Sequence, residues 1–351
     1  MKKALRQWHS LALAACCLPG TAISAPADGE KLRVVATHSI VAEWVEQVGG
    51  DAIELTALVQ PGSDPHSFIP LPGDGIALAK ADIIFKSGLG FEPWLDSLYA
   101  ASASKAKRVV LSAGLKRLRA GAVRREPTGP LPPCCAGKAA KEISPVAPAE
   151  QRQTAKTPAT PQQQEAGGDT QTQAEWDPHV WLDVKHAISA VILITDVLAE
   201  TRPADAEDFD TRAARYRNRL EALDQWIVEQ LAALPQGKRK MLTEHNSFTY
   251  FAHRYGLESP VSMFQSTHLE EAAPATSAVL SLVERLKADG AGAFFADAPE
   301  PSRLARSVAG EAGVKLAVLY ADALSPPGGP AASYEQLMRH NVETVVKGLS
   351  E

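Results

Sequence analysis

Three features of the sequence predict an α/β protein with two lobes, each a parallel β-sheet flanked by helices, joined by a long rigid helix. Short apolar runs alternate with helix-like stretches in both halves of the chain, a pattern typical of parallel sheets covered on both faces. A long segment between the halves repeats apolar residues every three or four positions. The 351 residues, 45% of them hydrophobic, suffice for two domains with sizeable cores.

The N-terminal residues are typical of an export signal, and we predict that residues 1–27 are a signal peptide. A basic start is followed by an apolar stretch, helix-breaking Pro19 and Gly20, and small residues up to Ala27. An alternative stays open, because LAAC resembles a lipobox and would make Cys16 a lipid anchor. The apolar stretch before Cys16 is short for a signal, so we favour the periplasm over lipid anchoring.

The first lobe is predicted to span residues 28–184, with strands in LRVVAT, IELTALV, DIIFKSG and RVVLSA. Residues 119–175 contain no aromatic residue and no histidine, and proline, glutamine, alanine and threonine dominate. Such a segment cannot bury enough apolar surface to offset its ordering entropy, so it is predicted to be a disordered insertion. It carries adjacent Cys134 and Cys135, for which incidental residues and a redox or metal-capture role are both open.

Residues 185–234 are predicted to form a helical connector. In DAEDFDTRAARYRNRLEALDQWIVEQLAAL the apolar residues share one helical face. Roughly 30 residues at ~1.5 Å each would give a rod long enough to run along both lobes; an ordinary packing helix within one lobe is the alternative. The second lobe, residues 235–351, repeats the alternation with RKMLTE, PVSMF, AFFAD and KLAVLY, and Gly290 and Gly313 are expected to end helices.

Four residues spread across both halves are the candidate metal ligands: His66, His179, His245 and Asp322. Three of them follow apolar runs, and ligands bind beyond the carboxyl ends of parallel strands. We therefore expect the metal site in the cleft between the lobes. Three imidazoles and one carboxylate form a set that tetrahedral Zn²⁺ favours, whereas Mn²⁺ prefers more oxygen donors. A four-ligand site leaves no position for an activated water, and HExxH is absent, so carriage of the metal is favoured over catalysis.

Other polar residues lie near these positions in the sequence. Asp64 and Asp177 each precede a ligand histidine through a proline, and either cap a turn or orient the imidazole. Glu244 directly precedes His245 and is interpreted as a surface residue, with an outer-shell partner of the site as the alternative. A role at the site stays open for His38 and His268. The remaining histidines of the mature chain are interpreted as surface or packed helix residues: His186, His253 and His340.

The sequence around the candidate ligands resembles that of the family of metal-binding lipoproteins and periplasmic zinc-binding proteins that supply ABC importers. The matching strings include QPGSDPHSF, SGLGFEPWLDSL, DPHVWLD, TEHNSFTYFAHRYGL and LYADAL. In that family the residues matching His66, His179, His245 and Asp322 bind the metal. Zinc members usually have histidine at the third position, where manganese members tend to have glutamate. The resemblance therefore implies a zinc-type member, with Zn²⁺ bound as cargo.

The sequence departs from the family pattern in three places, one of which is the stretch STHLEEAAPATSA, which matches the family only loosely. Ile69 stands after PHSF where the family usually has glutamate, and the histidine-rich loop of many zinc members is absent. We expect an exported, monomeric, high-affinity zinc-binding protein that delivers Zn²⁺ to an ABC permease in the inner membrane, with a periplasmic metallochaperone as a further partner. A manganese or iron carrier of the same importer class, or a surface adhesin, is the alternative. The net charge of −5 gives no reason to expect nucleic acid.

Overall fold

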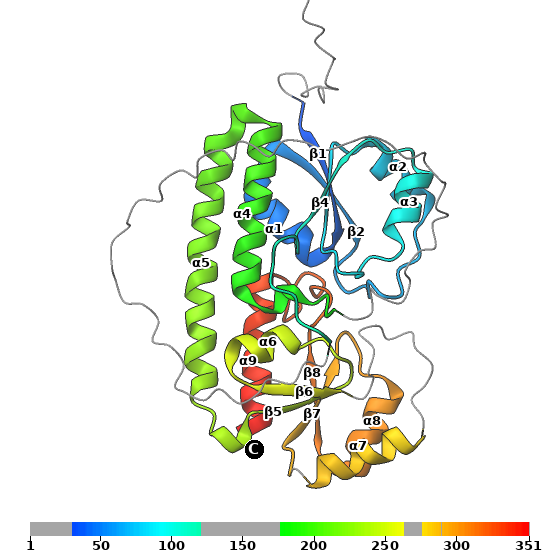
Figure 1. Cartoon of the computed structure of the whole chain (residues 1–351), viewed down its shortest axis with the longest axis vertical. Coiled ribbons are helices and arrows are strands. Elements are labelled where there is room, and N and C mark those ends of the chain that lie inside the picture. Colours follow the sequence, from blue (N-terminus) through cyan, green and yellow to red (C-terminus); the bar gives the residue numbers. More distant parts are fainter. Residues whose placement is uncertain (1–29, 121–175, 263–275, 289, 351) are drawn as a thin grey trace, which may run out of the picture.

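The computed structural model describes residues 30–120, 176–262, 276–288 and 290–350, which form two α/β lobes beside a pair of long helices (Figure 1). The two lobes and their parallel sheets confirm the predicted fold class. Several features named above lie outside the described residues: the signal peptide at 1–27 with Cys16, the insertion beyond residue 120 with Cys134 and Cys135, and His268.

The first lobe contains a four-stranded parallel sheet in the order β2-β1-β3-β4. Its strands match the four predicted apolar runs: β1 Leu32–His38, β2 Ile53–Val59, β3 Ile83–Lys86 and β4 Lys107–Val110. Along β1, Val34 packs in the large core and the next residue, Val35, packs in a separate core with Leu78 and Leu95. Helices cover both faces: α1 Ser39–Gly49 on one, and α2 Pro72–Lys80 and α3 Leu95–Ala101 on the other. This explains why β1 is apolar without alternation.

The second lobe repeats the arrangement with the strand order β6-β5-β7-β8. Its strands are β5 Lys240–Thr243, β6 Glu258–Ser262, β7 Ala293–Asp297 and β8 Lys315–Leu319. Its helices are α6 Thr249–Tyr255, α7 Thr276–Ala288, α8 Arg303–Ala312 and α9 Tyr334–Ser350. As predicted, Gly313 ends α8; its φ of 71° is one that glycine adopts without steric cost. In each sheet the first strand lies between the second and the third, and such switch points bind ligands.

Two antiparallel helices, α4 Val184–Thr201 and α5 Ala206–Ala232, occupy the predicted connector (Figure 1). Helix α5 contacts α1 of the first lobe and α9 of the second. The seven predicted positions on its apolar face are buried: Phe209, Ala213, Tyr216, Leu220, Leu223, Ile227 and Leu231. Contact with both lobes distinguishes α5 from a helix that packs within one lobe. Among the described residues, no helix combines the length and apolar character needed to cross a bilayer.

The loop between β8 and α9 is fastened to the first lobe by three hydrogen bonds. The backbone N–H of Gly62 donates to the carbonyl of Leu324 at 2.7 Å, and the N–H of Leu324 donates to Ser39 Oγ at 3.0 Å. Trp181, which is fully buried, donates its indole N–H to the carbonyl of Ala321 at 2.6 Å. The residues just after β8 are therefore held against the first lobe although they follow a strand of the second.

The contact between α1 and α5 contains a half-buried carboxylate that makes stability depend on pH. Glu43 accepts a hydrogen bond from the hydroxyl of Tyr216 at 2.8 Å, and burial raises the pKa of Glu43 from 4.5 to about 7. The folded chain therefore holds a proton that the unfolded chain has released, and stability falls as the pH rises from about 4.5 through 7. Glutamine keeps the acceptor and cannot ionise. We expect Glu43→Gln to raise the metal-free melting temperature at pH 8 by roughly 2–4 °C, which corresponds to ~1 kcal/mol.

Thermal unfolding of both proteins at pH 5 and pH 8 tests this prediction. The difference between variant and parent should nearly vanish at pH 5, where the carboxyl group is neutral in the folded chain. A difference of equal size at both pH values would contradict the assigned role of Glu43.

Candidate metal centre

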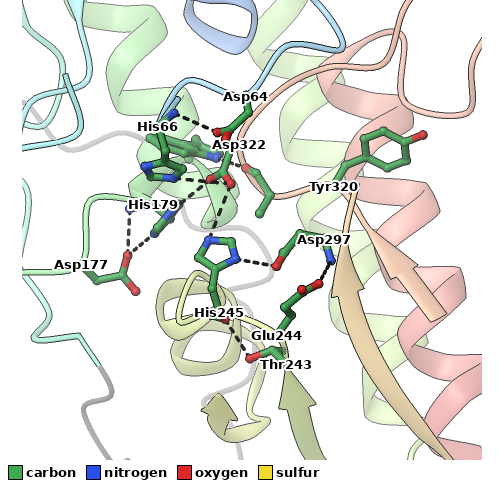
Figure 2. A network of polar contacts seen from close by, with 12 residues as sticks. Asp64, His66, Asp177, His179, Thr243, Glu244, His245, Asp297, Tyr320 and Asp322 are labelled. Carbon is green, nitrogen blue, oxygen red and sulfur yellow. Dashed lines mark hydrogen bonds and ion pairs between the residues drawn. The ribbon is translucent and has the colours of Figure 1, made fainter. Parts of the chain in front are cut away.

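The structure brings the four predicted residues together between the lobes (Figure 2). His66 lies in the loop after β2, His179 directly before the 3₁₀ turn Val180–Leu182, His245 after β5, and Asp322 after β8. Each offers one donor atom, and these atoms all lie within 4.8 Å of one another. Among the described residues, this is the one such group of three or more histidine, cysteine or acidic side chains.

The carboxylate of Asp322 lies at the centre of the cluster. Its Oδ1 is 3.0 Å from Nε2 of His179, and its Oδ2 is 3.6 Å from Nε2 of both His66 and His245. The Nε2 atoms of His179 and His245 are buried and, within the described chain, make no hydrogen bond. Buried polar atoms in that state cost free energy unless a ligand satisfies them. A divalent cation among these atoms would do so, and the donor set of three imidazoles and one carboxylate suits it.

A second layer of carboxylates orients two of the imidazoles (Figure 2). Asp177 Oδ1 lies 2.8 Å from Nδ1 of His179 and also accepts the backbone N–H of that residue at 2.9 Å. Asp297 Oδ2 lies 2.6 Å from Nδ1 of His245. Such contacts fix the ring so that Nε2 faces the metal position and increase the basicity of the imidazole. Asp64 instead accepts the backbone N–H of His66 at 2.8 Å, which shapes the turn.

Asp297 was not predicted to belong to the site. A signal for it exists, because Asp297 ends the apolar run AFFAD in the same way as Asp322 follows KLAVLY. Both strands end at the edge of the sheet that faces the cluster, so the same pattern places both carboxylates there.

The charges of the clustered carboxylates and imidazoles shift one another's pKa values. Burial alone lowers the pKa of His179, but the carboxylates of Asp177 and Asp322 outweigh burial and raise that pKa to about 10. Burial also lowers the pKa of His245, but the carboxylates of Asp297 and Asp322 outweigh burial, so that this pKa is raised. Burial would raise the pKa of Asp322, yet the neighbouring imidazoles hold it well below its usual range. The metal-free site therefore retains protons that a bound cation must displace.

The interpretation of Glu244 as a surface residue is wrong. Its exposed fraction is 2%, and its two carboxylate oxygens accept the backbone N–H groups of Asp297 at 3.2 Å and Ser302 at 3.3 Å. The carboxylate is buried because the loop that follows β7 covers the end of β5, an inner strand of the sheet. The two amide donors replace the water that the carboxylate loses on burial.

His38 lies behind the cluster rather than in it. Its ring is fully buried, with Nε2 2.7 Å from Ser87 Oγ and with ring contacts to Phe91 and Trp181. Burial lowers the pKa of His38 to about 3, so the ring is neutral. Phe91 also contacts the rings of His66 and His179, so His38 supports the wall of the site by packing. Two other histidines are also held by contacts away from the cluster: His186 against Tyr250, and His340 at the carbonyl of Val318.

A cavity of about 290 Å³ adjoins the cluster between the lobes. Its lining includes the central Asp322 together with Asp64, Glu244 and Asp297. Acidic groups facing one cavity raise the local concentration of cations. The cavity therefore offers an approach for a cation towards the four donor atoms.

Comparisons with known proteins identify the family and the relatives of this chain. The model of the family described as "ZnuA: Zinc-uptake complex component A periplasmic" matches residues 34–348. The chain is 29% identical to the "Manganese-binding lipoprotein MntA" of Halalkalibacterium halodurans, over 92% of this chain and 90% of that one. It is 26% identical to the "Iron ABC transporter substrate-binding lipoprotein MtsA" of Streptococcus pyogenes serotype M1, over 97% and 94%. The periplasmic zinc-binding protein TroA from Treponema pallidum has a similar structure, with a TM-score of 0.70, 21% identity, and coverage of 91% and 99%.

The two aspartates that precede histidines through a proline should differ in their effect on metal binding. Asp177→Asn removes the carboxylate beside Nδ1 of His179, and loss of such a partner typically weakens metal binding by about 10- to 100-fold. Asp64→Asn changes a carboxylate that accepts a backbone N–H, and we expect it to weaken binding less. Competition titrations with a chromophoric chelator measure both affinities. Equal losses for the two variants would contradict the distinction between ring orientation and turn formation.

Proposed function

The chain belongs to the ZnuA family of periplasmic zinc-uptake components, and from this premise we propose that it captures Zn²⁺ in the cleft between its lobes and delivers it to an ABC importer. The observation that carries the proposal is the convergence of three imidazoles and one carboxylate within 4.8 Å of one another. His66, His179, His245 and Asp322 are the proposed ligands, and the metal is cargo rather than a resident cofactor.

The preference for zinc rests on the chemistry of the donors. Three nitrogen donors and one oxygen donor complete the tetrahedral coordination that Zn²⁺ commonly adopts in proteins. All four donors come from protein side chains, so a tetrahedral ion keeps no open position for a reacting water. This supports carriage over hydrolysis.

A manganese or iron carrier of the same importer class is the second candidate. Two relatives that align with more than nine-tenths of this chain are named as manganese-binding and iron-transporter lipoproteins. Manganese prefers more oxygen ligands than this cluster supplies, and Asp322 is its one carboxylate. The donor set therefore supports zinc, and the names of the relatives support the alternative.

The proposed setting is the periplasm, with the permease of an ABC importer in the inner membrane as the partner. The N-terminal sequence supports export, through either a cleaved signal peptide or lipidation at Cys16. A periplasmic metallochaperone is a further proposed source of the metal, and we propose that the carrier acts as a monomer.

Removal of a proposed ligand should abolish tight binding while the fold remains. We expect His179→Ala to lower zinc affinity by more than about 100-fold, beyond the usual range for an outer-shell partner. The matched control is His186→Ala, which removes an imidazole from α4 that packs against Tyr250 outside the cluster. Chelator competition gives the affinities, and circular dichroism checks the fold. A His179→Ala protein with the affinity of the parent would contradict the proposed site.

The identity of the metal can be tested by thermal stabilisation. A ligand at 100 times its dissociation constant adds about 2.7 kcal/mol to the folded state. Each kcal/mol moves the melting temperature of a protein of this size by roughly 2–4 °C, so zinc should raise it by at least about 5 °C. Manganese at the same concentration should raise it clearly less. Equal shifts would remove the basis for preferring zinc and favour the second candidate.

A further inference from the structure

We propose that Glu244 is a positioning residue for the metal ligand His245 and that it acts through Asp297. This inference rests on the proposed function, because it concerns how one of the proposed ligands is held. Glu244 itself contributes no donor to the cluster, and its two carboxylate oxygens accept backbone N–H groups instead.

The first step is the attachment of Glu244 to the loop after β7. Its backbone N–H donates to the carbonyl of Phe295 at 2.8 Å, which continues the pairing of β5 with β7. Its side chain then accepts the N–H groups of Asp297 and Ser302, so one residue holds both ends of the turn between β7 and α8. Ser302 is also the residue that caps α8, and a carboxylate at a helix N-terminus is favourably placed in the field of the helix.

The second step leads from this turn to the metal ligand. Asp297 is held at its backbone by Glu244, and its side chain reaches Nδ1 of His245 at 2.6 Å (Figure 2). Because His245 follows Glu244 in the chain, the contacts form a closed ring that runs through the Glu244 side chain, Asp297, the imidazole and the backbone. Rotation of the imidazole away from the metal position must break a bond of this ring.

The other oriented imidazole needs no such support. Asp177 and His179 are two residues apart, and Asp177 also bonds the backbone of His179, so one local turn fixes both. Asp297 ends β7 and His245 follows β5, so the two residues are 52 positions apart in the chain. Their alignment depends on how the loop after β7 is held against the end of β5, and Glu244 makes that connection.

Substitution of Glu244 separates positioning from charge. In Glu244→Gln the amide nitrogen would face one of the two N–H donors, so one bond is lost and two donors oppose each other. Glu244→Asp keeps the charge but shortens the reach to the two amides. Glu300→Gln is the matched control, because Glu300 lines the same cavity, is exposed, and makes no contact with Asp297 in the described structure.

The experiment is a chelator competition with Zn²⁺ alone on the full chain, alongside metal-free melting temperatures. We expect both Glu244 variants to weaken zinc binding by about tenfold, the lower end of the range for outer-shell partners, and Glu300→Gln to change it by less than about twofold. Asp297→Asn should weaken binding at least as much. Adding Glu244→Gln to Asp297→Asn should cause little further loss, because both variants break the same ring.

Each alternative outcome has a distinct meaning. A lower melting temperature with unchanged zinc affinity in both Glu244 variants would make Glu244 merely structural and overturn the inference. So would an equal loss in Glu300→Gln, which would assign the effect to charge alone, or full additivity with Asp297→Asn. A parent protein that fails to bind zinc would instead contradict the proposed function.

Discussion

The proposed metal centre depends on one constraint, namely that the loop between β8 and α9 is held across the cleft against the first lobe. The indole N–H of Trp181 donates to the carbonyl of Ala321. The backbone N–H of Leu324 donates to Ser39 Oγ, and the carbonyl of Leu324 accepts the N–H of Gly62. These bonds flank Asp322 on both sides and place its carboxylate between three imidazoles. Without them, Asp322 would follow the second lobe, and the cluster would lose its central anion. Much of the buried aromatic packing around Trp181, including Phe91 and His38, maintains this arrangement.

The site also shows how a buried polar cluster is stabilised within the fold. Each imidazole is held by a contact outside the cluster: His66 by the ring of Phe91, His179 by the carboxylate of Asp177, and His245 by the carboxylate of Asp297. In a low-dielectric interior, such networks are stable only when every member finds a partner. A cation at the proposed site would complete the last set of contacts, and this would link metal binding to the protonation of the cluster.

Much of this could be predicted from the sequence, because the information was local. The eight strands of the described residues follow from short runs rich in apolar residues, and the inner strands β1 and β7 are apolar over most of their length because they are buried on both faces. The face of α5 follows from apolar residues three or four apart. The convergence of His66, His245 and Asp322 could be predicted because parallel strands direct their carboxyl ends to one edge of each sheet. His179 follows no strand, and its place in the cluster was expected from the family resemblance. The burial of Glu244 and the contact between Asp297 and His245 could not be predicted, because they depend on which loop covers the end of β5. The contact between Asp297 and His245 joins residues 52 positions apart, so it produces no periodic pattern in the sequence.

Because of the hydrogen bonds made by the loop after β8, three of the four donor residues are held by the first lobe and one by the second. His66 and His179 lie in the first lobe, and Asp322 is tied to that lobe by the bonds around it. His245 is the one donor that depends on the second lobe, through β5 and Asp297. A small rotation of the second lobe would therefore leave an ion with three protein donors and one vacant coordination position, rather than releasing it at once. Water or a donor from a receiving protein could take that position, so that exchange would proceed by ligand substitution on a partly coordinated ion. The rate of metal transfer would then depend on how firmly one imidazole is held, whereas the equilibrium affinity depends on all four.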